Sequence, residues 1–99
     1  RDYFRAGLYD RAEKLFQQLA EDGRDRALAL HYLVRIYEIQ REWAQAAEAH
    51  DRLRAVGVPE QHAAIAHYYC ELAEAAIAEG DYAQALEHLK RASQEQNEF

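Results

Sequence analysis

Ala6-Gly7-Leu8-Tyr9-Asp10-Arg11-Ala12 places a turn before an aromatic side chain, with a small alanine three residues further on. The same order recurs in Gln40-Arg41-Glu42-Trp43-Ala44-Gln45-Ala46 and in Glu79-Gly80-Asp81-Tyr82-Ala83-Gln84-Ala85. The aromatic residues of the three windows lie 34 and then 39 residues apart, and the alanines keep the same spacing. Such internal repetition predicts that similar structural units follow one another along the chain.

A period of 34 residues with this content resembles the tetratricopeptide repeat, which is a helix–turn–helix unit. The alanines Ala12, Ala46 and Ala85 would let the two helices of each unit pack closely, and the aromatic residues would fill core positions beside the turns. One Pro and four Gly in 99 residues also favour helix. The expected fold class is all-α, a tetratricopeptide-repeat right-handed solenoid of antiparallel helix pairs.

The 99 residues are expected to form a single repeat segment with four parts. These parts are a truncated repeat one (1–26), repeat two (27–58), repeat three with a long first helix (59–93), and a polar, fraying tail (94–99). Helices are expected at about 1–6, 9–20, 26–40, 42–55, 59–79 and 81–93. Pro59 suits the first turn of its helix.

The turns have recognisable residues. Gly7 and Gly80 are expected to end helices in the left-handed conformation. Arg41 replaces that glycine in the middle repeat, so its turn needs another solution. Asp25 and Asp81 are candidate caps for the helices that follow them.

The composition excludes several classes of function. The net charge of −6 argues against a nucleic-acid partner, because binding to phosphates needs clustered Lys and Arg. No apolar run is long enough for direct membrane insertion, and no secretory signal is visible. Cys70 is the single cysteine, so an internal disulfide is excluded. Since the chain starts at Arg1 in mid-helix and ends where another repeat would begin, we expect an excised segment of a longer array, whose exposed ends favour a homodimer.

The sequence gives little support for a catalytic site or a metal site. Phosphate-binding, dinucleotide-binding and zinc-protease motifs are absent from the sequence, so we expect no enzyme and no catalytic residue. His67, Cys70, Glu71 and Glu74 follow one helical stripe and could form a partial zinc site, with His31 and His50 as further donors. The simpler interpretation is a polar stripe facing a groove, and we adopt it, with no metal and no cofactor in this segment.

The remaining histidines have structural interpretations. His50 occupies a core position of repeat two and is expected to be buried and hydrogen-bonded. His62 and His88 are expected at the surface.

In tetratricopeptide arrays the first helix of each repeat lines a concave groove. The resemblance therefore assigns a partner-binding role to one set of side chains. These are Phe4, Arg5, Leu28, His31, Arg35, Glu38, His67, Cys70, Glu74 and Ile77.

Two stretches carry a narrower resemblance. Ala6-Gly7-Leu8-Tyr9-Asp10-Arg11-Ala12-Glu13, with Arg1-Asp2-Tyr3 before it, and Ile65-Ala66-His67-Tyr68-Tyr69-Cys70-Glu71-Leu72-Ala73 are similar to the lipopolysaccharide assembly protein B family of Gram-negative bacteria. The resemblance spans essentially the whole chain and implies a non-enzymatic adaptor. That family is anchored in the inner membrane with its repeats on the cytoplasmic face. This segment, lacking the anchor, is expected to be soluble.

The resemblance also implies the partners. They are a membrane AAA+ protease, the lipid A deacetylase whose proteolysis the adaptor promotes, and the family's own rubredoxin-like zinc module. This segment contains neither the anchor nor the paired cysteines of that module, so those properties are not carried over to its residues. Two other functions stay open: a metal-binding helical protein that uses His67, Cys70 and Glu74, and a purely structural repeat spacer.

Overall fold

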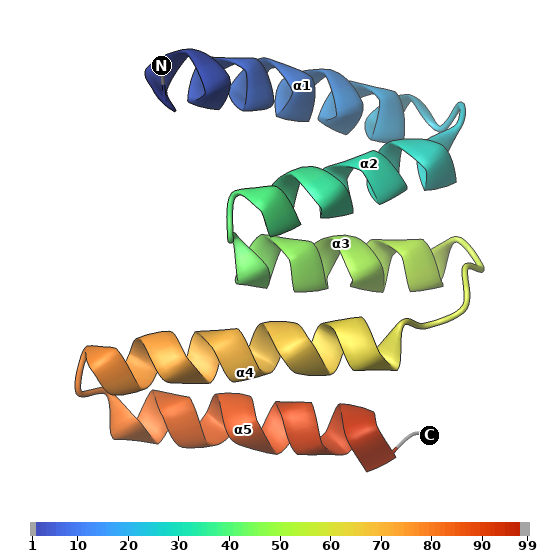
Figure 1. Cartoon of the computed structure of the whole chain (residues 1–99). Coiled ribbons are helices and arrows are strands. Elements are labelled where there is room, and N and C mark those ends of the chain that lie inside the picture. Colours follow the sequence, from blue (N-terminus) through green and yellow to red (C-terminus); the bar gives the residue numbers. More distant parts are fainter. Residues whose placement is uncertain (1, 98–99) are drawn as a thin grey trace.

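The computed structural model describes the backbone of residues 2–97 and the side chains of residues 7–96. The described chain forms five helices and no strand, which confirms the all-α class. They are α1 (Asp2–Asp22), α2 (Arg26–Ile39), α3 (Trp43–Ala55), α4 (His62–Ala78) and α5 (Tyr82–Asn97). Consecutive helices run antiparallel and lie side by side in chain order (Figure 1).

The helices form an open array. Among the described residues, the backbone of each helix packs closely only against the helix before it and the helix after it in the chain. The array measures 38 × 37 × 16 Å, so it is thin in one direction. An array of this kind leaves long helix faces uncovered. None of the described helices is long and apolar enough to cross a membrane.

Small side chains fill the places where the helices meet, as the repeat spacing predicted. Ala46 in α3 and Ala85 in α5 are buried, whereas Ala12 in α1 is half-buried. The larger buried cluster joins α1, α2 and α3 and reaches Tyr68 of α4. A smaller cluster of three alanines, Ala73, Ala76 and Ala85, joins α4 to α5. Close helix packing therefore depends on alanine at both places. The repeat boundaries themselves remain a prediction.

The predicted break at Gly7 is wrong. Residues 2–22 form one helix, and Gly7 has no positive φ angle. Gly7 is exposed, and a Cβ atom added there would meet nothing within 4 Å. Since the described chain packs only α2 against α1, no second helix forces a turn at this glycine. Gly80, in contrast, has φ 79° and ends α4 as predicted.

The two glycines should therefore respond in opposite ways to alanine. Gly7→Ala is expected to raise the free energy of unfolding by about 0.5–1 kcal/mol, because alanine is the better helix former. Gly80→Ala is expected to lower it by about 1–2 kcal/mol, because an L-residue is strained at this φ. Urea unfolding of both variants checks this. If Gly7→Ala proved less stable than the wild type, the result would favour a turn at Gly7 over a continuous helix.

The other turns are solved locally. Arg41 itself adopts the left-handed conformation, with φ 60°. The middle turn therefore forms with arginine at the position where the other repeats have glycine. The Asp81 carboxylate accepts a hydrogen bond from the backbone N–H of Gln84 at 3.2 Å, which confirms the predicted cap. Asp25 was wrongly predicted as a side-chain cap. Its backbone is left-handed at φ 55°, and its carbonyl group, not its carboxylate, accepts the N–H of Ala29.

Three predictions about the second half of the chain are also wrong. Pro59 lies in the linker before α4, which starts at His62, because the backbone of the preceding Gln61 is not helical (φ −103°, ψ 71°). The tail does not fray from residue 94, since α5 continues to Asn97 and Glu95 is only 5% exposed. Tyr82 was expected in the core but is 69% exposed, because α5 packs only against α4 in the described chain.

Candidate partner-binding face

The predicted groove residues that the structure describes lie on α2 and α4. Most of these side chains are exposed: Leu28, His31 and Arg35 on α2, and His67, Cys70, Glu74 and Ile77 on α4. We call these seven residues together the α2–α4 face. Glu38 belongs to the same predicted set but is half-buried. The side chains of Phe4 and Arg5 lie outside the described residues.

A buried polar relay connects α2, α4 and α3 beneath this face. The Tyr68 hydroxyl group of α4 donates a hydrogen bond to the Glu38 carboxylate of α2. Since a hydroxyl group has one proton, the Tyr68 oxygen accepts its second bond from His50 Nε2 of α3, at 3.1 Å. His50 is therefore buried and hydrogen-bonded, as predicted. Burial raises the pKa of Tyr68 and lowers the pKa of His50, so both groups favour their neutral forms.

Trp43 positions the start of the face on α4. Its ring lies 5.7 Å from the Tyr68 ring in a stacked arrangement and 5.3 Å from the His67 ring edge-on. His67 is thus held on one side by Trp43 while it stays exposed to solvent. Sequence analysis missed the role of Tyr68. The only signal for it was a large polar aromatic residue, one position beyond a predicted groove residue.

Removal of the Tyr68 hydroxyl group should destabilise the joint between these helices. Tyr68→Phe keeps the ring but leaves Glu38 and His50 without their shared partner, which is expected to cost about 1–2 kcal/mol of unfolding free energy. Tyr9→Phe, on a half-buried ring of α1, is the control and should change little. Thermal unfolding measures both, and equal melting temperatures for the two variants would contradict the relay.

His50 should also make stability depend on pH. Its pKa is lowered in the folded chain, so the unfolded chain binds the proton more readily below about pH 6.5. The His50 contribution to stability is therefore present above pH 6.5 and is lost as the pH falls through the folded-state pKa. Urea unfolding at pH 7.5 and 5.5 should show a smaller acid loss in His50→Gln than in the wild type. An equal loss in both would exclude His50 as its source.

The stripe predicted as an alternative metal site does not gather its donors. Among the described residues, the group of three metal-type donors that comes together is Glu60, His62 and Glu95, with the ligand atoms within 4.8 Å of one another. His67, Cys70, Glu71 and Glu74 are not part of it. His62 was wrongly predicted at the surface, since its side chain is only 20% exposed. His88, predicted with it, is half-buried and contacts Gln84.

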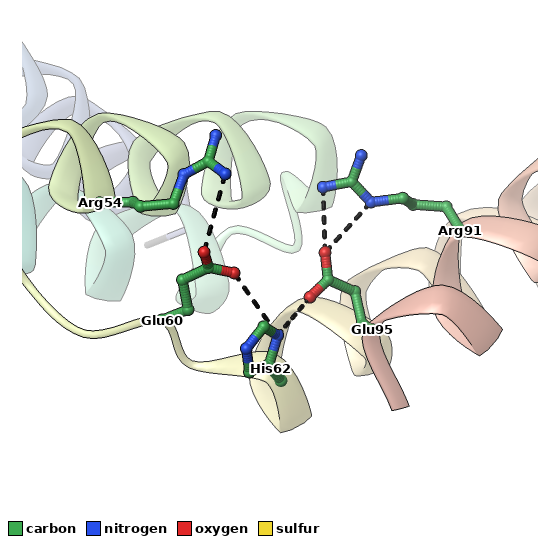
Figure 2. A network of polar contacts seen from close by, with 5 residues as sticks. All are labelled: Arg54, Glu60, His62, Arg91 and Glu95. Carbon is green, nitrogen blue, oxygen red and sulfur yellow. Dashed lines mark hydrogen bonds and ion pairs between the residues drawn. The ribbon is translucent and has the colours of Figure 1, made fainter. Parts of the chain in front are cut away.

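The donors around His62 belong to a network of ion pairs (Figure 2). His62 Nδ1 lies 2.6 Å from Glu95 Oε2 and 3.5 Å from Glu60 Oε2. Arg91 approaches Glu95 Oε1 at 3.0 Å, and Arg54 approaches Glu60 Oε1 at 3.7 Å. Each carboxylate is therefore already paired with an arginine, which reduces its attraction for a metal ion. This network could not be predicted from local sequence patterns, because His62 and Glu95 are 33 residues apart in the chain.

Comparison with known proteins gives a consistent result. No protein-family model matches the chain. The chain is 44% identical over 92% of its length to "Lipopolysaccharide assembly protein B" of Escherichia coli K12. It is 31% identical over 75% of its length to the protein of the same name in Haemophilus influenzae. The chain spans only 23% and 19% of these two relatives. Over most of its length, the chain thus resembles a segment of lipopolysaccharide assembly protein B, the family that its sequence indicated.

Proposed function

We propose that this chain is a non-enzymatic protein-interaction segment of an adaptor, and that the α2–α4 face binds its partner. The open array supports this proposal, because helices that pack only against their neighbours leave extended faces free for binding. We further propose that the helices form tetratricopeptide pairs in a right-handed solenoid. The 34-residue spacing and the buried Ala46 and Ala85 support that arrangement.

The observation that carries the proposal is the character of the α2–α4 face. Leu28 is 55% exposed and Ile77 is 47% exposed, and charged Arg35 and Glu74 stand near them in the sequence on the same two helices. Mixed apolar and charged surface of this kind is typical of protein interfaces that form and dissociate. The polar relay of Glu38, Tyr68 and His50 holds α2 and α4 in a fixed relation, so the face is organised before a partner arrives.

The names of the relatives concern lipopolysaccharide assembly. We propose that the chain belongs to a longer protein at the cytoplasmic face of the inner membrane, where it regulates lipopolysaccharide synthesis. In this proposal it promotes proteolysis of the committed-step lipid A deacetylase by a membrane AAA+ protease. The rubredoxin-like zinc module of the family would be a further partner, and the segment itself would need no cofactor.

The proposal is tested by complementation with a double variant. Arg35→Glu with His67→Ala alters α2 and α4 on the proposed face. Arg52→Glu with His88→Ala makes the same two changes on α3 and α5 and is the matched control. Cells that lack the full-length protein receive each form, and the deacetylase level is measured by immunoblot, with folding checked by circular dichroism.

The face variant is expected to leave the deacetylase several-fold more abundant than the wild type does, while the control variant restores the normal level. Equal restoration by both variants would support a structural spacer instead. If both correctly folded variants failed to restore the normal deacetylase level, binding would not be specific to the α2–α4 face.

A further inference from the structure

The network around His62 joins parts of the fold that otherwise do not meet. Arg54 lies at the end of α3, Glu60 in the α3–α4 linker and His62 at the start of α4, while Arg91 and Glu95 come from the last turns of α5 (Figure 2). In the described chain α3 and α5 do not pack against each other. The polar chain is therefore a direct side-chain path from α3 to α5.

The groups that face this site come from every neighbouring element. A hollow beside His62 is lined by four of the network residues, Arg54, Glu60, Arg91 and Glu95, together with Asp51 of α3 and Gln94 of α5. Glu60 and Glu95 carry negative charge toward His62, and each is backed by one arginine. With Asp51 included, three carboxylates face two arginines, so a proton on the imidazole brings the net charge of this cluster from −1 to zero.

The two contacts of His62 Nδ1 differ in kind. At 2.6 Å the Glu95 oxygen takes the Nδ1–H hydrogen bond, which the neutral imidazole can also donate. The Glu60 oxygen lies 3.5 Å from His62 Nδ1, which is too far for a good hydrogen bond. Attraction between the negative carboxylate and a positively charged imidazole therefore holds Glu60 near His62. The contact with Glu60 therefore depends on the positive charge of His62, whereas the contact with Glu95 only becomes weaker without it.

We infer that His62 is a proton-dependent latch at the α3–α4 joint: its charged form holds the linker through Glu60 and the end of α5 through Glu95, and loss of the charge loosens both. This inference goes beyond the proposed function and does not require it. In the described chain α3 also packs directly against α4, so the latch adds to the packing and the Tyr68 hydrogen bonds that hold α1–α3 and α4–α5 together.

The behaviour of Glu95 supports the assignment of the titrating group. Burial disfavours the charged form of Glu95, but the hydrogen bonds from His62 and Arg91 outweigh burial and hold its pKa below the ordinary value. Glu95 thus stays charged between pH 6 and 8. In this range histidine is the side chain that ordinarily changes charge.

Amide hydrogen exchange of the 99-residue chain tests the latch. Exchange is followed by mass spectrometry at pH 6 and pH 8, each corrected for the intrinsic rate, in residues 56–62 and 91–96. In the wild type, protection of both segments is expected to be about twofold to fivefold lower at pH 8 than at pH 6, the size that an ion pair near the surface gives. His62→Gln and Glu60→Gln should abolish or reduce this pH effect.

His88→Gln on α5 is the control and should keep the wild-type pH effect. Because Glu60 lies in the linker and is exposed, Glu60→Gln preserves the fold even if His62→Gln does not. His50 is unchanged in every variant and acts in the opposite direction, so it cancels in the comparison. A pH effect in correctly folded His62→Gln that equals the pH effect in the wild type would overturn the latch.

Discussion

Leu30→Ala is expected to lower the free energy of unfolding by about 2–5 kcal/mol. Leu30 in α2 is fully buried, at 0% exposure, in the cluster that joins α1, α2 and α3. Truncation to alanine removes apolar surface from the centre of this cluster and leaves a cavity that the surrounding helices fill only in part. In a domain of 99 residues a loss of this size is a large share of the total stability.

Leu28→Ala provides the control within the same helix. Leu28→Ala makes the same substitution two positions earlier, on the exposed side of α2. It should lower the free energy of unfolding by less than about 0.5 kcal/mol. Urea unfolding curves give both values. If the two variants lost similar amounts of unfolding free energy, α2 would not have one buried side and one exposed side.

Ala46→Leu has the second largest expected effect, a loss of about 1–3 kcal/mol. Ala46 in α3 is fully buried in the cluster that α1, α2 and α3 share, and leucine would add three carbon atoms there. The larger side chain would push the helices apart or force strained rotamers. The loss should appear in the melting temperature and in the urea midpoint together.

Ala44→Leu, two residues earlier in α3, places the same side chain on an exposed position. It should leave stability nearly unchanged, because leucine and alanine differ little in helix propensity. A stable Ala46→Leu variant would mean that the helix pair does not depend on a small residue at this place.

The repeat pattern predicted much of the fold from the sequence. The spacing of Trp43, Ala46 and His50 placed one buried side of α3 correctly, and the pairing of Gly80 with Asp81 located the turn before α5. These features succeed because they are local or recur at a fixed interval. The direction of the chain at such turns is decided by a few neighbouring residues.

Predictions failed where a contact with a distant residue, or the lack of one, decides the outcome. Gly7 stays helical because no helix of the described chain folds back at that point. Tyr82 is exposed because its side of α5 has no neighbour among the described helices. Glu95 is buried by partners that include His62, 33 residues away, and no local pattern reports such a pair.

The candidate face shows the same division. The tetratricopeptide resemblance assigned Leu28, His31 and Arg35 to one face of a helix, and all three are exposed on α2. It could not show that Glu38 turns inward to Tyr68, because that bond joins residues 30 positions apart on different helices. The resemblance to a repeat family was enough to suggest an exposed face, whereas the contacts that fix its geometry depend on the tertiary fold.

Site-specific photo-crosslinking in cells tests most directly whether the α2–α4 face binds a partner. A photo-reactive residue replaces Arg35 or Ile77 in the full-length protein, and Arg52 on α3 serves as the control position. We expect one and the same protein to be captured from positions 35 and 77 and not from position 52. Capture of that protein only from position 52, or of none from positions 35 and 77, would contradict a partner-binding role for this face.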